Sequence, residues 1–471
     1  MTDSGIRDNY DVAVVGAGPA GLSSAAFCAK AGLSTVLFDE QASPGGQIYR
    51  AITQSPLKRE SLLGQEYWQG SRIAAEFLAS GAQYVSGATV WSLTPEREIG
   101  VSVGGGSILL HAKRVILATG ALERPFPIPG WTLPGVMTAG AGQTLMKASG
   151  LAPQGATVLA GCGPLLWLLA SQYLNAGVKI DAILDTTPVE NRAKAFPHVL
   201  AFLFSPYFAK GLSLMLSVRR QVRVIDGVTA LRARGEGKVG SVAFRRHDGA
   251  EESMPVDTLF LHQGVVPNVN LAMSVGIEHR WDDGQLCWNP VLDANGNTSV
   301  EGIAIAGDGG GIAGAQAASW SGVLAAIEAL NVLKPGPASE VEPLARAALA
   351  RFRRGRRFLD ALYRPAEHFR LPEGNTIVCR CEEITARQIL ETVALGCPGP
   401  NQMKSFLRCG MGPCQGRFCG LTVTELIARA RGALPQDVGH FRLRPPVKPI
   451  TVAELARLPK SEAAVKAVVR L

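Results

Sequence analysis

Apolar residues near the N-terminus form two short runs separated by one helical stretch. Tyr10–Val15 is an apolar run typical of a buried strand, and an alanine-rich helix is expected from Leu22 to Ala31. A second apolar run, Ser34–Phe38, ends at two acidic residues. This order of strand, helix and strand predicts a β-α-β unit with parallel strands.

The turn between the first strand and the helix carries a Gly-x-Gly-x-x-Gly motif. Gly16 permits a tight turn, Gly18 lets the backbone approach a pyrophosphate, and Gly21 lets the helix pack close to the strand. The helix N-terminus then faces the phosphates. The pair Asp39-Glu40 stands where a ribose-binding acid is expected, so the unit predicts a dinucleotide site.

Three later segments lie where a flavoprotein would need them. They are the glycine turn Pro44–Gln47, a strand leading into Ala118–Gly120, and a strand leading into Gly307-Asp308. Together with the first motif they resemble flavoproteins with two dinucleotide-binding domains, such as thioredoxin reductase, and this resemblance implies FAD in the first site. The residues expected to bind the cofactor are Gly16, Gly18, Pro19, Ala20, Gly21, Asp39, Glu40, Gln41, Gly46, Gln47, Val90, Ala118, Thr119, Gly120, Gly307 and Asp308.

A second β-α-β unit begins with the strand Ala156–Ala160. Its turn opens with Gly161, but Leu166 replaces the third glycine, and Asp185 ends the next strand. The substitution compromises the close approach of helix and strand. It favours a retained fold without a hydride donor over a working nicotinamide site, and a structural nucleotide remains an alternative.

Six of the nine cysteines lie between positions 379 and 419, partly in a glycine-rich loop. Four thiolates grouped in this way can hold an iron–sulfur cluster, although they also suit tetrahedral zinc. The flavin-type domain on the same chain favours iron–sulfur. The predicted ligands are Cys379, Cys381, Cys414 and Cys419, with Cys409 as the main alternative and Cys397 as a weaker one.

Short helices are expected around these cysteines. A capping box starts a helix at Thr385 that continues through Leu395, and further helices fit Gln402–Leu407 and Leu421–Arg431. Metal ligation would supply stability that so small a module lacks. The module resembles the [2Fe-2S] domain of the bacterioferritin-associated ferredoxin type. It departs from that type because four residues, rather than two, separate its second cysteine pair.

The whole chain resembles a more specific family. The motifs are Gly45–Arg50, Gly120–Pro125, Gly130–Gly140 and the Cys-Arg-Cys-Glu sequence from Cys379. Together they are similar to the α subunit of the opine oxidase family, which includes octopine and nopaline oxidases, D-hydroxyproline dehydrogenase and one hydrogen cyanide synthase subunit. The resemblance implies a β subunit resembling D-amino acid oxidases, which carries the substrate-oxidising FAD. It also implies an FMN at the subunit interface.

Charge and hydropathy restrict the kinds of partner the protein is expected to bind and where in the cell it is expected to lie. The net charge of +8 is concentrated around Arg351–Arg357, and no recognised nucleic-acid module accompanies it, so a nucleic-acid partner is not expected. No apolar run is long enough to span a bilayer, and no signal peptide is evident, which predicts a cytoplasmic protein. The apolar and basic segment Phe196–Arg220 favours core or subunit-interface packing, with peripheral association at the inner face of the membrane as the alternative.

These observations predict an α/β flavoprotein of the thioredoxin and glutathione reductase type, followed by a small helical [2Fe-2S] module. Its function is expected to be that of an electron-transferring subunit of a heteromeric dehydrogenase acting on CH–NH bonds of opines, D-hydroxyproline or a related amino or imino acid. No catalytic residue is assigned, and electrons pass outward to a further acceptor. The alternatives are a stand-alone NAD(P)H-dependent ferredoxin-type reductase and a nonenzymatic iron–sulfur scaffold or redox sensor.

The expected domains are an FAD-binding domain (9–150 and 266–335), a degenerate nucleotide-binding domain (151–265), a basic connecting segment (336–373), the [2Fe-2S] module (374–432) and an extended C-terminal arm (433–471).

Overall fold

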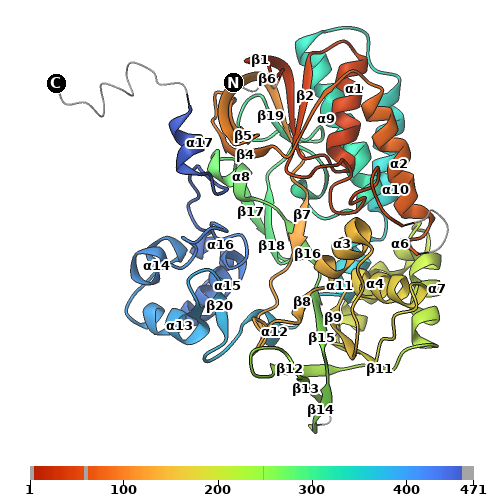
Figure 1. The fold of residues 1–471 in the computed structure, drawn as a ribbon, viewed down its shortest axis with the longest axis vertical. Coiled ribbons are helices and arrows are strands. Elements are labelled where there is room, and N and C mark those ends of the chain that lie inside the picture. Colours follow the sequence, from red (N-terminus) through yellow and green to blue (C-terminus); the bar gives the residue numbers. More distant parts are fainter. Residues whose placement is uncertain (1–4, 58–61, 248, 459–471) are drawn as a thin grey trace.

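A computed structural model describes residues 5–57, 62–247 and 249–458. Figure 1 shows two α/β domains stacked along the long axis, with a smaller helical module packed against one side of them. This arrangement agrees with the predicted fold class.

The first domain is built on a seven-stranded sheet with the order β3-β2-β1-β6-β5-β4, in which β19 also pairs with β6. Val15 is in register with Phe38 and Leu117, and Ile305 also pairs with Leu117. The segments that follow these four residues therefore meet at one edge of the sheet. The elements of this domain are β1 (Asn9–Val15), α1 (Pro19–Lys30), β2 (Thr35–Asp39), α2 (Gln65–Leu78), β3 (Gln83–Ser86), β4 (Thr89–Leu93), β5 (Glu98–Val103), β6 (Gly106–Leu117), α8 (Asn270–Ser274), β17 (His279–Asp282), β18 (Cys287–Pro290), β19 (Ile303–Ile305), a 3-10 turn (Gly307–Gly310) and α9 (Ala315–Leu333).

Helix α1 begins three residues earlier than the sequence pattern suggests. Gly18 is its N-cap and Pro19 occupies its first position, where a missing N–H costs nothing. The small residues of α1 and α9 are buried against each other and against the sheet, in a core that includes Ala25, Ala325 and Ala329. The close packing places the N-terminus of α1 directly at the edge where the strands end.

The second domain contains a five-stranded parallel sheet, β11-β10-β9-β15-β8, and a separate antiparallel sheet, β12-β13-β14. The two-stranded sheet of β7 and β16 joins this domain to the first. The elements are β7 (Ala121–Glu123), β8 (Val136–Thr138), α3 (Ala139–Ser149), β9 (Thr157–Cys162), α4 (Pro164–Asn175), β10 (Ala182–Asp185), α5 (Asn191–Ala195), a 3-10 turn (Phe196–His198), α6 (Val199–Leu203), α7 (Phe208–Arg219), β11 (Val224–Ile225), β12 (Val228–Arg234), β13 (Ser241–Arg246), β14 (Glu251–Pro255), β15 (Thr258–Gln263) and β16 (Val265–Pro267).

The apolar segment between β10 and β11 forms short helices at the surface. Phe196, Leu200 and Phe204 are exposed, so they do not pack in the core. In the described part of the chain, no single helix has the length and hydropathy to cross a bilayer. The pair Asn191–Leu203 and Phe208–Arg219 meets both criteria only jointly, and it bends by 119°.

The basic connecting segment is helical, and it leads into the module at one side of the two domains (Figure 1). The predicted capping box at Thr385 is present, with Gln388 as its partner. Phe441, which lies in the predicted arm, is buried in the module's core. Residues 459–471 of that arm lie outside the described residues. The elements are α10 (Val341–Arg353), α11 (Arg356–Leu362), α12 (Glu367–Arg370), β20 (Ile377–Cys379), β21 (Ile384–Thr385), α13 (Ala386–Ala394), α14 (Pro400–Leu407), α15 (Gly420–Arg431), α16 (Pro435–Val438) and α17 (Val452–Ala456).

Candidate functional site

The glycine turn of the first domain is packed so tightly that side chains would not fit at its first and third glycines. A Cβ atom on Gly21 would lie 1.8 Å from the carbonyl oxygen of Gly16, and one on Gly16 would lie 2.5 Å from that of Ala118. On Gly46, which has a φ of +60°, a Cβ would lie 2.7 Å from the Cα of Gly18. The turn, the segment after β6 and the second glycine turn therefore form one backbone cradle.

The remaining predicted segments meet the same cradle. A Cβ on Gly307 would lie 2.9 Å from the Cβ of Ala20, and one on Gly309 would lie 3.6 Å from the amide nitrogen of Gly120. The structure thus brings the predicted residues to one edge of the sheet. They lie in the turn and first helical residues (Gly16, Gly18, Pro19, Ala20, Gly21), after β2 or at its end (Asp39, Glu40, Gln41), in the second glycine turn (Gly46, Gln47), in β4 (Val90), after β6 (Ala118, Thr119, Gly120) and after β19 (Gly307, Asp308).

The two acids after β2 have different surroundings. The carboxylate of Asp39 accepts hydrogen bonds from the backbone N–H groups of Ala17 (2.5 Å) and Gln41 (2.6 Å). Burial raises the pKa of Asp39, and these two hydrogen bonds oppose that shift. The carboxylate of Glu40 is exposed and lies 2.6 Å from the ammonium of Lys448. Asp39 therefore fixes the turn, whereas Glu40 is the acid that remains accessible to a ribose.

The aspartate after β19 supports the loop that follows it. One carboxylate oxygen of Asp308 accepts hydrogen bonds from the backbone N–H groups of Ala313 and Gly314, both at 2.9 Å. This arrangement orients the start of α9. The cradle as a whole has the glycine spacing, the helix N-terminus and the acid that an FAD phosphate and ribose require.

In the second domain, the corresponding turn lies at the ends of β9 and β15. Gly163 has a φ of +120°, and a Cβ there would lie 3.2 Å from the imidazole of His262. Nδ1 of that histidine lies 2.7 Å from the Glu123 carboxylate. Leu166 is fully buried in the core beside α3, so the residue that replaces the third glycine serves packing.

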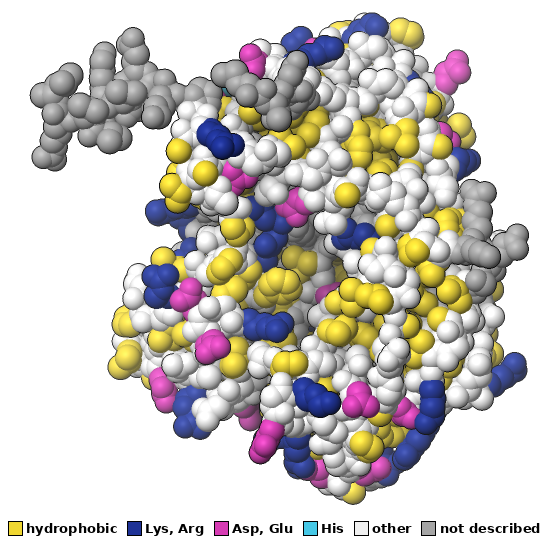
Figure 2. Space-filling view, in the orientation of Figure 1, with side chains coloured by type: hydrophobic (Ala, Val, Ile, Leu, Met, Phe, Trp, Pro, Cys, Tyr) yellow, Lys and Arg dark blue, Asp and Glu magenta, His cyan; other side chains and the backbone are white. Residues whose placement is uncertain are grey.

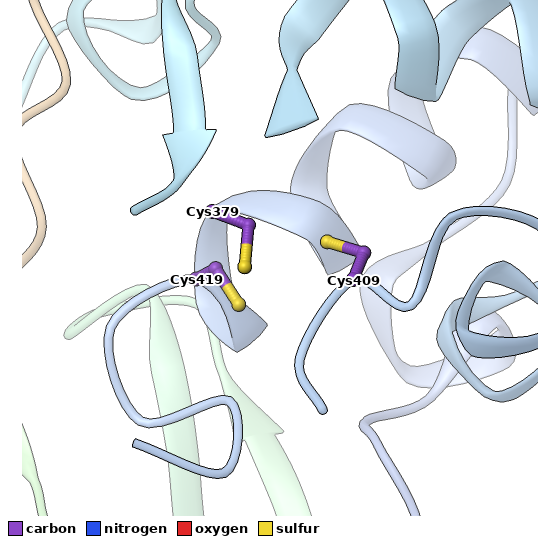
Figure 3. A group of neighbouring side chains, drawn as sticks. All are labelled: Cys379, Cys409 and Cys419. Atoms are coloured by element: carbon purple, nitrogen blue, oxygen red, sulfur yellow. The ribbon is translucent and has the colours of Figure 1, made fainter. Parts of the chain in front are cut away.

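Three of the module's cysteines converge on one point. The sulfur atoms of Cys379, Cys409 and Cys419 lie within 4.8 Å of one another. Figure 3 shows them pointing toward each other from β20, from the loop after α14 and from the residue before α15. Hydrogen bonds from the thiols of Cys409 and Cys419 lower the pKa of Cys379 well below its ordinary value. A shared cluster of thiols that stabilises a thiolate is suited to bind a metal.

The other two predicted ligands lie beside this group. Cys381 is exposed, and its thiol interacts with that of Cys414. A Cβ on Gly412 would lie 2.3 Å from the Cβ of Cys381, so the glycine loop packs directly against this residue while its thiol stays exposed. Cys397 is held apart, with its sulfur 3.4 Å from the carbonyl oxygen of Gly399. The structure therefore brings together the thiols of Cys379, Cys409 and Cys419, and it places the interacting pair Cys381 and Cys414 beside them.

One short segment connects the cysteine loop with the first cofactor site. The N–H of Asn268 donates to the carbonyl oxygen of Gly120 (2.9 Å), and the Thr119 hydroxyl donates to the carbonyl oxygen of Asn268 (3.2 Å). Two residues further on, the Asn270 side-chain amide donates to the carbonyl oxygen of Gln415 (2.9 Å), next to Cys414. Two residues span at most about 7 Å of chain. The two sites are therefore neighbours.

Sequence reasoning missed Lys448 and Asn270. Lys448 lies in the proline-containing arm and contacts Glu40, which precedes it by 408 positions in the sequence. Asn270 lies in a short helix with no motif around it. Neither residue has a local sequence signal, because each acts through a contact that only the tertiary structure creates.

The fold and the glycine cradle define an oxidoreductase with two dinucleotide-binding domains and an added cysteine module. Residues 10–322 match the pyridine nucleotide-disulphide oxidoreductase family, and residues 373–457 match the sarcosine oxidase A3 domain. The first match implies an FAD site. The second covers the cysteine module together with the arm.

Individual relatives match over nearly the whole chain. The A subunit of the opine oxidase of Agrobacterium tumefaciens (strain Ach5) is 49% identical over 98% of this chain and 94% of its own length. The hydrogen cyanide synthase subunit HcnB of Pseudomonas aeruginosa is 32% identical over 96% of this chain and 99% of its own. The crystal structure of L-proline dehydrogenase from P. horikoshii has the same fold, with a TM-score of 0.71 at 19% identity, over 95% of this chain and 80% of that one. The chain therefore belongs to the family of the opine oxidase A subunits, and it is one subunit of an oxidoreductase.

Proposed function

We propose that this chain is the electron-transferring subunit of a heteromeric dehydrogenase that oxidises a CH–NH bond in an opine, D-hydroxyproline or a related amino or imino acid. The relatives named as opine oxidase subunits support the substrate class and the presence of further subunits. The chain's own part is to hold a flavin and a metal cluster close together. The substrate is bound on a partner that resembles D-amino acid oxidases.

The observation that supports the proposal most directly is the short segment from Asn268 to Asn270, which connects the first cofactor site with the cysteine loop. Asn268 is hydrogen-bonded to the segment after β6, and Asn270 is hydrogen-bonded to the cysteine loop. Short separation in a rigid protein is what electron transfer between two centres requires. A bound FAD would supply exchange between two-electron and one-electron steps.

Each part of the first cradle is suited to bind a particular part of FAD. The turn at Gly18 and the N-terminus of α1 would bind the pyrophosphate, and the Glu40 carboxylate would accept hydrogen bonds from the ribose hydroxyls. Asp308 holds the start of α9 in place, so that its N-terminus also faces the cofactor. Thr119 holds the segment that leads to the cysteine module.

For the cluster, we propose a [2Fe-2S] centre held by Cys379, Cys381, Cys414 and Cys419. Cys379 and Cys419 belong to the converging group of thiols, and Cys381 and Cys414 interact beside it. Backbone N–H groups near the sulfurs, such as that of Gly410 at Cys379, would tune a cluster's potential. Cys409 is the alternative ligand because it lies with Cys379 and Cys419. Structural zinc is the competing metal, since it also accepts four thiolates.

The partner surface is proposed on the face where the module meets the two domains. Figure 2 shows that this face is hollowed between them and that apolar and basic side chains gather around the hollow. An FMN at this interface and a downstream electron acceptor complete the proposed chain of carriers. We place the assembly in the cytoplasm, with the exposed apolar side chains of the α5–α7 region as the alternative contact to the inner face of the membrane.

Co-expression with the partner tests the proposal. Opine- or amino acid-dependent dye reduction is expected only from the complex, and the complex should contain about two irons per copy of this chain. Full turnover by the isolated chain would place the substrate site on this polypeptide and refute the accessory role. Stoichiometric zinc with negligible iron would refute the cluster while leaving the fold-based assignment intact.

A further inference from the structure

The end of α11 and the segment after it are held to the second β-α-β unit by two partly buried hydrogen bonds. The side-chain amide of Asn191 donates to the main-chain carbonyl oxygens of Leu362 (3.0 Å) and Arg364 (2.8 Å). Asn191 is only 2% exposed, and it begins α5, shortly after the end of β10. The amide thus uses both of its N–H groups to hold a connecting segment against the nucleotide-binding edge of the second sheet.

Tyr363 is the residue between Leu362 and Arg364 in the sequence, and it contacts the nucleotide turn. Its own carbonyl oxygen is 3.5 Å from the sulfur of Cys162, the middle residue of the Gly-Cys-Gly turn. Its hydroxyl is hydrogen-bonded to Trp167 in the first turn of α4, and the charge of Asp185 acts on it. In a dinucleotide-binding unit, the space between the glycine turn and the acid at the end of the second strand holds the adenosine half of the ligand.

Helix α11 is anchored independently of these contacts. The ring of Phe358 stacks on that of Phe202 with centroids 4.3 Å apart and an interplanar angle of 13°. Asp360, which also pairs with Arg356 within the helix at 2.6 Å, accepts a hydrogen bond from the Gln285 side chain of the first domain at 3.3 Å. The segment is therefore a packed part of the fold on both sides.

We propose that residues 356–364 are a built-in occupant of the second nucleotide site, in which Tyr363 takes the place of the adenosine ribose of NAD(P)H. The second domain then keeps the nucleotide-binding fold but serves as a docking platform for the connecting segment that carries the cysteine module. Electrons reach this chain from a partner and not from a nicotinamide. The inference concerns only the second domain, so it stands whether or not the cysteines hold iron and whichever amine is oxidised.

The thiol of Cys162 gives a direct measure of occupancy because it is 1% exposed and contacts the main-chain carbonyl of Tyr363. The purified wild-type chain is treated with N-ethylmaleimide under native conditions, and labelling of each cysteine is followed by mass spectrometry. We expect Tyr363→Ala and Asn191→Ala to label Cys162 about tenfold faster than wild type, as ~1.4 kcal/mol of easier local opening gives. Tyr363→Phe keeps the ring and should behave as wild type. Cys28, buried in the first domain, should stay unlabelled in every variant and reports that the fold is intact.

Two results would overturn the inference. The first is a Cys162 labelling rate in both alanine variants that equals the rate in Tyr363→Phe. The second is binding of one NADH or NADPH per wild-type chain in equilibrium dialysis, with the first site saturated by FAD, that is abolished by Asp185→Ala. The Asn191→Ala variant keeps the labelling test decisive if Tyr363→Ala does not fold, because it leaves the tyrosine in place.

Discussion

Two ion pairs join helices α12 and α15, and they allow one prediction with an internal control. Arg370 pairs with Glu425, and their side chains are only 14% and 5% exposed, respectively. Glu367 pairs with Arg429 at 3.4 Å, with side chains 55% and 73% exposed. Both pairs link the connecting segment to the cysteine module, so they differ mainly in burial.

Removal of one partner from the buried pair leaves an uncompensated charge in the protein interior. Glu425→Gln is therefore expected to cost about 3–5 kcal/mol of local stability. Glu367→Gln, in the exposed pair, should cost about 0–1 kcal/mol, because water and salt screen that interaction. Burial already lowers the pKa of Arg370 to about 10, which reflects the cost of holding this guanidinium away from water.

Native-state amide hydrogen exchange in α15 measures the opening free energy of the module without unfolding the rest of the chain. For Glu425→Gln, protection of the buried α15 amides should fall by roughly 150-fold or more, while Glu367→Gln changes it at most about fivefold. A double-mutant cycle with Arg370→Met isolates the pair's coupling. Equal effects of the two glutamine variants, or a coupling energy below about 1 kcal/mol, would refute the argument from burial.

Three further predictions concern the module and the first site. Cys414→Ser should abolish the electron paramagnetic resonance signal of the reduced cluster and Cys397→Ser should keep it, whereas loss of the signal only in Cys409→Ser would overturn the ligand choice. Lys448→Met should tighten FAD binding by at most about fivefold, because it frees the predicted ribose acid from an exposed ion pair; weaker binding in a fluorescence titration would contradict this. Burial lowers the pKa of His440 to about 4. Between pH 4 and 6.5 the folded module therefore binds fewer protons than the unfolded one. Its free energy of unfolding should fall as the pH falls through that window, by up to roughly 3 kcal/mol. His440→Gln should flatten this dependence in urea unfolding, and an unchanged slope would exclude His440 as its source.

Motifs with local geometry were predictable from the sequence. The glycine turn at Gly16 needs small residues in a fixed order because backbone atoms approach each other there, and the same order appears in the sequence. The capping box at Thr385 is also local, since its hydrogen bonds join residues three positions apart. The sequence therefore predicted the α/β class and the existence of a helical cysteine module.

Contacts between distant segments could not be predicted in the same way. The clustering of Cys409 with Cys379 depends on how the loop after α14 folds back over β20, and six cysteines in a short region permit several ligand sets. Tyr363 lies in an arginine-rich stretch whose composition indicates only an exposed helix or arm. Its position over Cys162 follows from the packing of α11 against the second domain.

The module is held to the two domains from several directions, and this bears on how electrons move. Phe369 packs edge-on against Phe126 of the second domain at 5.3 Å, while the next residue pairs with α15. Trp131 donates a hydrogen bond to the carbonyl oxygen of Ile377, two residues before the first cysteine. After the module, the chain returns to the first domain, where the N–H of Val447 donates to a β4 carbonyl oxygen. A module clamped at its entry, at its cysteine loop and at its exit keeps a fixed distance from the first cofactor site, so the proposed electron transfer requires no domain rotation.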